Sequence, residues 1–174
     1  MKKPAARPRW TNNRRYLADF ERRRGRRRPW GCIVIDIDHF KQYNDRYGHQ
    51  AGDDVLLRMS RFLMRQTRAE EGVVRTGGDE FVVLLSGTDL ATVEFTARRL
   101  ELAAKSEAPV AFSLGWAARR SGEKLERTIA RADHHMFSVR LRSRAPGRDR
   151  RAGGVEPFPP PGRIGWRRPS GLHS

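Results

Sequence analysis

The sequence is poor in the features that mark secreted and membrane proteins. Cys32 is its only cysteine, so no disulfide can form within the chain, as is usual in a reducing cytosol. No apolar run approaches the roughly 20 residues that a transmembrane helix needs. The N-terminus is basic, but no apolar segment follows it as a secretory signal requires. These absences predict a cytoplasmic protein without a membrane span.

Two common kinds of active site are also missing. The sequence contains no G-x-x-x-x-G-K-[ST] phosphate loop, which argues against a P-loop enzyme. It offers no pairing of a serine or cysteine nucleophile with histidine that would suit covalent hydrolysis. Any catalytic chemistry must therefore depend on other groups, of which the acidic residues are the clearest.

Positive charge is plentiful, and the excess over negative charge lies at the two ends of the chain. The 174 residues carry 36 Lys and Arg against 20 Asp and Glu, a net charge of +16. Residues 1–28 and 140–174 hold 12 and 9 of the basic residues, each with 2 acids, which leaves 15 basic and 16 acidic residues between them. The basic ends could contact nucleic acid or an anionic membrane surface, although a solvated arginine-rich flank is the simpler interpretation.

The apolar pattern predicts one folded domain, residues 13–144, between two disordered ends. Residues 1–12 are basic, and residues 145–174 are rich in Arg, Pro and Gly without periodicity. The expected order is helix 13–24, strand 30–37, helix 40–47, a helix from 53, strands 73–76 and 81–85, helix 89–104, strand 109–118 and helix 123–144. This order predicts an α/β protein of the α+β type, with a mostly antiparallel sheet, flanking helices and a ferredoxin-like βααββαβ core.

Acidic residues interrupt the clearest strand near its end. The apolar run 30–37 is typical of a central strand with both faces covered, yet it contains Asp36, and Asp38 follows on the same face. A carboxylate in this position needs a partner or a metal to offset its desolvation. Asp38 could instead cap the following helix, but Asp36 lies too far upstream for that.

A second pair of carboxylates follows two glycines between the predicted strands 73–76 and 81–85. Gly77 and Gly78 suit a tight hairpin turn with positive φ, which places Asp79 and Glu80 at its tip. If Asp36 lies at the same edge of the sheet, three carboxylates meet there. Oxygen ligands of this kind bind hard divalent ions, which support nucleotidyl transfer.

Two stretches resemble the motifs of the GGDEF-domain diguanylate cyclases. They are G-G-D-E-F at 77–81 and D-I-D-H-F-K-Q-Y-N-D-R-Y-G-H-Q-A-G-D at 36–53. The resemblance implies a nucleotide-cyclase-like version of the fold. It also implies an enzyme that converts two GTP into cyclic di-GMP and two pyrophosphates, with Mg²⁺ or Mn²⁺ as cofactor. The family works as a homodimer in which each subunit holds one GTP.

The resemblance also implies roles for individual residues. Asp36, Asp79 and the carbonyl of Ile37 would bind the metal, and Asp79 and Glu80 would be the catalytic acids. A candidate inhibitory site lies at Arg68 and Glu71, where the family has R-x-x-D. Substrate binding is implied for the guanine-reading pair Asn44 and Asp53, for Lys41, His49, Gly77 and Gly78, and for Arg140 and Arg144 in the last helix.

Two other functions remain open at this point. The chain could be a module that binds GTP or cyclic di-GMP without turnover, because its N-terminal W-T-N-N-R is shorter than the family's D-x-L-T-G-L-x-N-R. It could also be a nucleic-acid-associated protein that uses its arginine-rich ends. Turnover of GTP separates the first of these from a cyclase.

Overall fold

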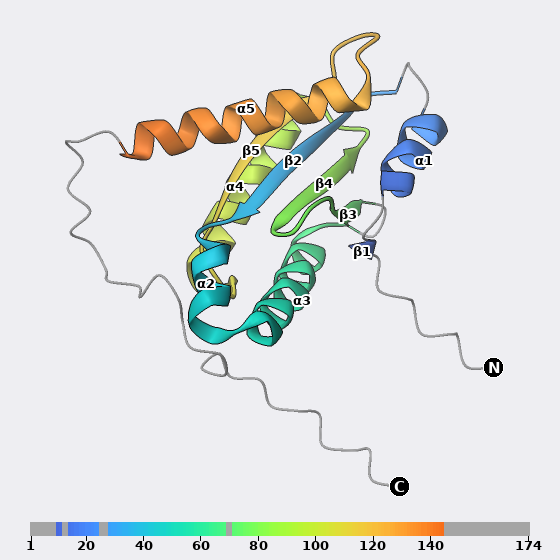
Figure 1. Ribbon diagram of the computed structural model, residues 1–174. Coiled ribbons are helices and arrows are strands. Elements are labelled where there is room, and N and C mark those ends of the chain that lie inside the picture. The colour runs from blue at the N-terminus through green and yellow to red at the C-terminus, as the bar shows by residue number, and fades with distance from the viewer. Residues whose placement is uncertain (1–9, 12–13, 25–27, 69–70, 145–174) are drawn as a thin grey trace, which may run out of the picture.

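The computed structural model describes residues 10–11, 14–24, 28–68 and 71–144. The sheet has five strands in the order β1-β3-β4-β2-β5, antiparallel throughout except for the short parallel pair β1–β3. The predicted α+β fold and its βααββαβ core are confirmed. Along the chain the elements are β1 Trp10–Thr11, α1 Arg14–Arg24, β2 Trp30–Ile37, α2 Phe40–Tyr47, α3 His49–Gln66, β3 Gly72–Arg75, β4 Glu80–Ser86, α4 Leu90–Glu107, β5 Phe112–Ala118 and α5 Leu125–Arg144 (Figure 1).

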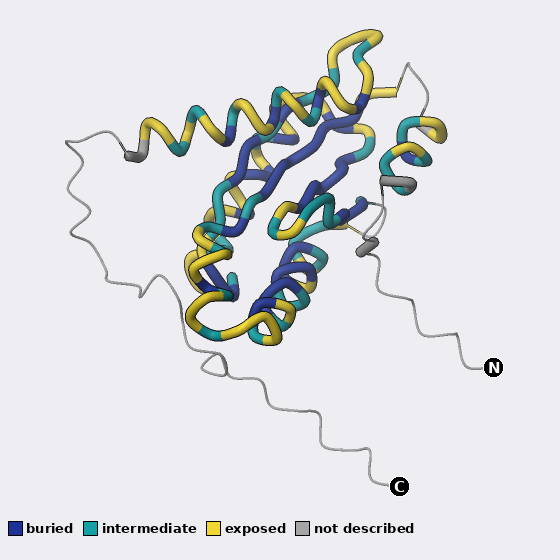
Figure 2. The backbone as a smooth tube through the Cα atoms, in the orientation of Figure 1, coloured by how far each residue is buried: buried dark blue, intermediate teal, exposed yellow. Residues whose placement is uncertain are grey.

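The central strand β2 separates two apolar cores. Ile33, Ile35 and Ile37 face the core that α2, α3 and α4 complete, whereas Cys32 and Val34 face the core completed by α1 and α5. In Figure 2 the strands β2 and β4 are dark blue along most of their length, as expected for strands that are covered on both faces. Because side chains alternate along a strand, Asp36 points to the same side as Val34, toward α5. The alternation thus places the first candidate carboxylate under the last helix.

α5 lies in direct contact with the backbone of β5. A Cβ atom on Gly115 would be 2.3 Å from both the Ala132 carbonyl oxygen and the Met136 nitrogen. Only a residue without a side chain allows the helix to approach the strand this closely. Gly115 therefore fixes the height of α5 above the sheet, and with it the position of the side chains that α5 presents to Asp36.

Several element boundaries differ from the sequence prediction. α3 begins at His49 rather than Asp53, because Gly48 adopts φ 84° and separates α2 from α3 by itself. Asp53 is therefore inside a helix and does not flank a loop. Trp10–Thr11 form β1 and are not part of a disordered segment, whereas the predicted disorder at 1–9, 12 and 145–174 lies outside the described residues. None of the helices in the described part is long and apolar enough to cross a lipid bilayer.

Candidate active site

Three strands bring polar groups together beside Asp36. In the antiparallel register, Asp36 is opposite Glu80 of β4 on one side and opposite Ser113 of β5 on the other. Where β2 ends, the N–H of Ile37 donates to the carbonyl of Asp79 at 3.2 Å. The sheet thus joins the end of β2 to the β3–β4 hairpin and brings Asp36, Asp79 and Glu80 to one edge, as the sequence predicted.

The β3–β4 hairpin is held by an arginine and not by a left-handed glycine turn. Arg75 donates from Nη2 to the Gly78 carbonyl at 2.7 Å and from Nε to the Gly77 carbonyl at 3.1 Å. Neither glycine has positive φ, so the expected reason for them is wrong. A Cβ on Gly77 would lie 2.8 Å from Oε2 of Glu80, whereas one on Gly78 would meet nothing within 4 Å. The absence of a side chain at Gly77 therefore leaves space for the Glu80 carboxylate. At Gly78 a side chain would clash with no described residue.

The two carboxyl groups of the hairpin, Asp79 and Glu80, both have a raised pKa. Burial is the largest cause of the raised pKa of Asp79, and the negative charge of Asp36 adds to it. The pKa of Glu80 is raised by burial first and then by Asp36, Asp79 and Asp133. Each group therefore holds its negative charge at a cost that a bound cation would remove.

Arg140 of α5 supplies one such cation. Its Nη2 donates to Oδ1 of Asp36 at 2.5 Å and to Oδ1 of Asp38 at 2.9 Å. Asp38 also accepts from the Ser113 hydroxyl at 2.7 Å. The family resemblance implied that Arg140 binds a substrate phosphate. In this structure its guanidinium lies between the carboxylates of Asp36 and Asp38. Asp38 is therefore part of this cluster, and its side chain faces Arg140 and Ser113.

The cluster opens into a cleft of about 540 Å³ between the sheet edge and α5. Sequence reasoning missed its α5 wall, in particular Asp133, His134 and Phe137. Asp133 and Arg140 are seven residues apart and therefore share a helix face, a spacing that could have identified Asp133. The cleft is lined by Asp36, Glu80, Ala130, Asp133, His134, Met136, Phe137 and Arg140.

The donor set suits a divalent ion that is shared with a ligand. No group of three or more His, Cys, Asp or Glu side chains within the described ranges is arranged to hold a metal by itself. Two carboxylates, from Asp36 and Asp79, with a backbone carbonyl such as that of Ile37 fit Mg²⁺, which usually takes one or two carboxylates and completes its shell with water and phosphate oxygens.

The helical hairpin α2–α3 carries the residues predicted to read a base. A Cβ on Gly52 would lie 1.8 Å from Oδ1 of Asn44, so the Asn44 amide lies against Gly52, next to Asp53. This Oδ1 atom is buried and has no hydrogen-bond partner among the described residues. A buried acceptor without a partner is costly unless a ligand supplies a donor. Asp53, Lys41 and His49 are exposed on the same hairpin.

The remaining predicted residues have other surroundings. Oε2 of Glu71 accepts from the backbone N–H of Arg68 at 2.6 Å, so this carboxylate closes its own turn. Arg144 is the last residue of α5, and its side chain lies outside the described part. The structure thus relates Arg68 to Glu71 but brings neither to the acidic cleft.

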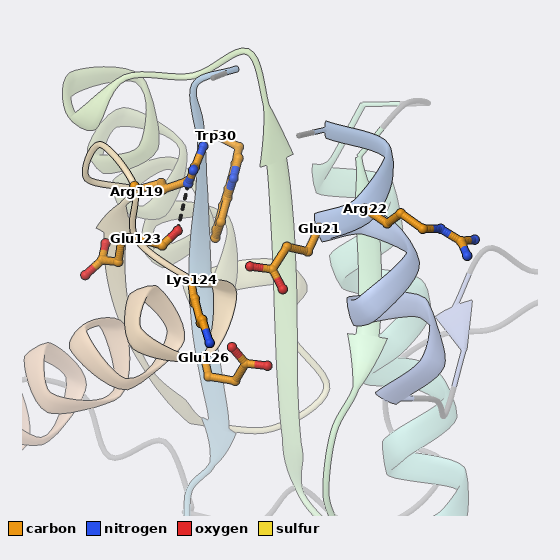
Figure 3. A pocket seen from close by; sticks show the side chains of 8 residues that line it. Glu21, Arg22, Trp30, Arg119, Glu123, Lys124 and Glu126 are labelled. Carbon is orange, nitrogen blue, oxygen red and sulfur yellow. Dashed lines mark hydrogen bonds between the residues drawn. The ribbon is translucent and has the colours of Figure 1, made fainter. Parts of the chain in front are cut away.

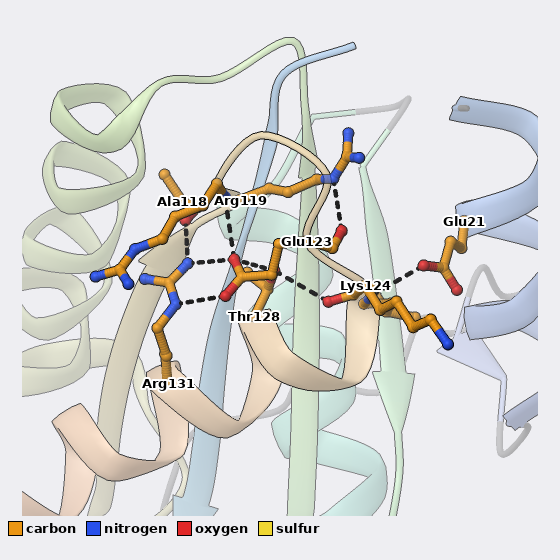
Figure 4. Close-up of polar contacts among 9 residues, drawn as sticks. Glu21, Ala118, Arg119, Glu123, Lys124, Thr128 and Arg131 are labelled. Carbon is orange, nitrogen blue, oxygen red and sulfur yellow. Dashed lines mark hydrogen bonds and ion pairs between the residues drawn. The ribbon is translucent and has the colours of Figure 1, made fainter. Parts of the chain in front are cut away.

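A larger cavity, of about 720 Å³, lies between α1 and the start of α5 (Figure 3), and none of Asp36, Asp79 and Glu80 lines it. Its neighbourhood is a structural network. The carboxylate of Glu123 accepts two hydrogen bonds from Arg131, at 2.9 and 2.6 Å, and Arg131 also donates to the Ala118 carbonyl (Figure 4). Glu21 accepts from the N–H of Leu125 at 3.0 Å and so ties α1 to the first turn of α5. The polar groups of Glu21, Glu123 and Arg131 are therefore used in hydrogen bonds that connect β5, α1 and α5.

Comparison with known proteins points to one family. The family model for "Diguanylate cyclase, GGDEF domain" matches residues 11–146. Diguanylate cyclase DosC of Escherichia coli K12 is 34% identical over 125 residues, which are 67% of this chain and 27% of DosC. Diguanylate cyclase DgcP of Pseudomonas aeruginosa is 38% identical over 126 residues, 67% of this chain and 18% of DgcP. The chain thus spans about a quarter or less of these curated relatives.

Solved structures agree. The active GGEEF domain of a diguanylate cyclase from Vibrio cholerae superposes with a TM-score of 0.66 at 28% identity, covering 75% of this chain and 91% of that one. The GGDEF domain of DgcB from Caulobacter crescentus, solved in complex with c-di-GMP, gives 0.61 at 26% identity, covering 75% and 81%.

Proposed function

Because this chain belongs to the GGDEF-domain diguanylate cyclase family, we propose that it condenses two GTP into cyclic di-GMP and releases two pyrophosphates. The observation that carries the proposal is the meeting of Asp36, Asp79 and Glu80 at one edge of the sheet. Burial and the negative charge of Asp36 raise the pKa of both Asp79 and Glu80, a cost that a fold without a cation at this place would not need. The proposed location is the cytoplasm, where GTP is available.

Under this proposal Asp36, Asp79 and the Ile37 carbonyl hold Mg²⁺ or Mn²⁺. A divalent ion bound there would neutralise triphosphate charge and polarise the α-phosphate. Glu80, whose pKa is raised, takes the proton of a 3′-hydroxyl. The hydroxyl oxygen forms a bond to the α-phosphorus of the second GTP as the bond to pyrophosphate breaks.

The base and the phosphates would be held by different helices. Asn44 and Asp53 on α2–α3 accept hydrogen bonds from the guanine N1–H and exocyclic amine, which adenine does not offer in that pattern. The buried Oδ1 of Asn44 supports this role, because it accepts no hydrogen bond from any described residue and a guanine N–H could donate to it. Lys41, His49, Arg140 and Arg144 supply positive charge for the phosphates, and Gly77 and Gly78 allow the backbone to approach the nucleotide.

Ring closure needs two copies of this cleft. Each GTP supplies one hydroxyl and one α-phosphate, so a homodimer with one GTP per subunit completes both bonds. Product could act back on the enzyme through the candidate inhibitory residues Arg68 and Glu71. In that case the Glu71 carboxylate would have to leave the Arg68 backbone N–H that it now accepts from.

A second candidate function is a module that binds GTP or cyclic di-GMP without turnover. The observation that favours it is the position of Arg140, which already neutralises Asp36 and Asp38. If Arg140 does not leave these carboxylates, nucleotide can bind but the metal cannot.

One assay separates the two functions. The full chain at high concentration, incubated with GTP and Mg²⁺, is expected to yield cyclic di-GMP and pyrophosphate, detected by chromatography and mass spectrometry. Asp79→Asn should abolish both products. Asp89→Asn is the matched control, because asparagine can still accept the N-cap hydrogen bond from Thr92. GTP binding without product in the wild type would favour the binding module.

A further inference from the structure

A second cleft, of about 670 Å³, lies between α5 and β5 and adjoins the acidic cleft, since Ala130 and His134 line both. We propose that this arginine cleft binds single-stranded nucleic acid through its phosphate backbone. The residues that carry the proposal are Trp116, Arg120, Arg127, Arg131, His135 and Arg142.

The charge of the arginine cleft is not balanced from within. Glu123 is the one acidic residue that lines it, and its carboxylate is held by Arg131 at 2.6 Å (Figure 4). No described residue forms an ion pair or hydrogen bond with the side chains of Arg120, Arg127 or Arg142. Three guanidinium groups on the wall of one cleft therefore remain available to an anion.

Other helices of the chain treat surface arginines differently. Arg58 on α3 pairs with Asp54, and Arg98 on α4 pairs with Glu94, each at an i,i+4 spacing. The residue four positions before Arg127 is Glu123, but its carboxylate is bound by Arg131, so Arg127 has no such partner. A merely solvated helix gains from interleaved charges, so an unbalanced row in a cleft favours an external polyanion.

The cleft also contains an aromatic surface. The Trp116 ring meets the His135 ring edge-on, with centroids 4.2 Å apart, and the guanidinium of Arg98 lies 5.6 Å from the indole centroid. The backbone N–H of Trp116 donates to Nδ1 of His135 at 3.3 Å, which fixes the imidazole beside the indole. Aromatic side chains within a basic groove are the pattern by which proteins stack unpaired bases.

The distance between the arginines along α5 favours a nucleic-acid strand over a small anion. Arg127 and Arg142 are fifteen residues apart on α5, which corresponds to about 22 Å along the helix axis. A free phosphate or a mononucleotide would reach only part of this row. Stacking on Trp116 requires an unpaired base, which favours a single strand over a duplex.

The test is fluorescence anisotropy of the full chain with a fluorescein-labelled uridine oligonucleotide at several salt concentrations. The variant Arg127→Glu/Arg142→Glu should weaken binding at least about tenfold and lower the salt slope by about 1.4, the value for two lost phosphate contacts on a single strand. Trp116→Leu should weaken binding about fivefold or more through lost stacking.

The control is Arg23→Glu/Arg65→Glu, which changes the net charge equally at exposed positions of α1 and α3. All variants must melt as the wild type does, followed by circular dichroism. An equal loss in the control would assign binding to overall charge and overturn the proposal. So would a cleft that binds GMP, cyclic di-GMP or phosphatidylglycerol vesicles in an Arg127- and Arg142-dependent way but not the oligonucleotide.

Discussion

Arg140 is the residue on which the acidic cleft depends in the absence of a bound cation. A single nitrogen of its guanidinium contacts both Asp36 and Asp38, and all three side chains are about a quarter exposed, at 27%, 21% and 28%. Hydrogen bonds between charged groups at this depth are stronger than surface ion pairs. The arginine therefore stabilises the two carboxylates at the position where a metal ion would be needed.

This competition predicts the behaviour of Arg140→Met. Without its counter-ion, the metal-free protein should lose about 1–2 kcal/mol of unfolding free energy, discounted for partial exposure. Added Mg²⁺ should then raise its melting temperature more than that of the wild type, because the ion no longer displaces an arginine. Thermal unfolding in EDTA and in Mg²⁺ measures both effects.

Arg142→Met is the matched control, since Arg142 lies on the same helix but lines the other cleft. It should melt as the wild type does in both buffers. If Mg²⁺ stabilises Arg140→Met no more than this control, Arg140 does not compete with the metal.

At the level of elements, the loop between β5 and α5 is closed by the carboxylate of Glu123, which is largely shielded from solvent. The Glu123 side chain is 10% exposed, and hydrogen bonds from Arg131 lower its pKa to about 2. A depressed pKa stabilises the folded state above the unfolded pKa of the group, and this contribution is lost as the pH falls through the folded pKa. For Glu123 the loss should run from about pH 4.5 down to about pH 2.

Glu123→Gln should therefore cost on the order of 2 kcal/mol of unfolding free energy at pH 7. Urea unfolding at a series of pH values should show the difference from wild type shrink below pH 4.5. Glu101→Gln on the exposed face of α4 is the control and should match the wild type throughout. A deficit of Glu123→Gln that stays constant down to pH 3 would mean that packing, not charge, makes the contribution.

The contact between α5 and β5 allows a second test at this scale. Gly115→Ala puts a methyl group 2.3 Å from the α5 backbone, so the helix must move away from the sheet. Overpacking of this kind costs about 1–3 kcal/mol. The displacement should also move Arg140 and Asp133 from the carboxylates and reduce GTP turnover. Gly78→Ala, which meets nothing within 4 Å, should keep the wild-type melting temperature.

Elements with strong local signals could be predicted from the sequence. β2 and α2 have the expected bounds, because an apolar run ends at Ile37 and Gly48 ends the helix. The start of α3 was missed because one glycine reverses the chain without a loop. The ion pair of Arg140 with Asp38 and the place of Asp133 in the cleft wall were missed for another reason. It depends on how α5 crosses the sheet, and Gly115, which sets that crossing, has no local pattern that reveals its role.

At the scale of the whole molecule, the proposed reaction needs two active sites, and one chain supplies one. The acidic cleft holds one set of carboxylates, whereas cyclic di-GMP contains two new phosphodiester bonds. Phe137 lines this cleft and is 57% exposed, and Leu141, one turn further along α5, is 54% exposed. An apolar rim beside a half-site suits contact with a second copy of the chain.

Mixing experiments test this arrangement. Excess Asp79→Asn chain, added to a fixed amount of wild type, should suppress cyclic di-GMP formation, because a mixed dimer completes at most one of the two bonds. The double variant Asp79→Asn/Phe137→Glu should suppress far less, because a charge on the rim weakens pairing. Turnover per wild-type chain, measured against added variant, distinguishes the outcomes. Activity that is indifferent to Asp79→Asn and to protein concentration would show that each chain acts alone, and the homodimer would be wrong.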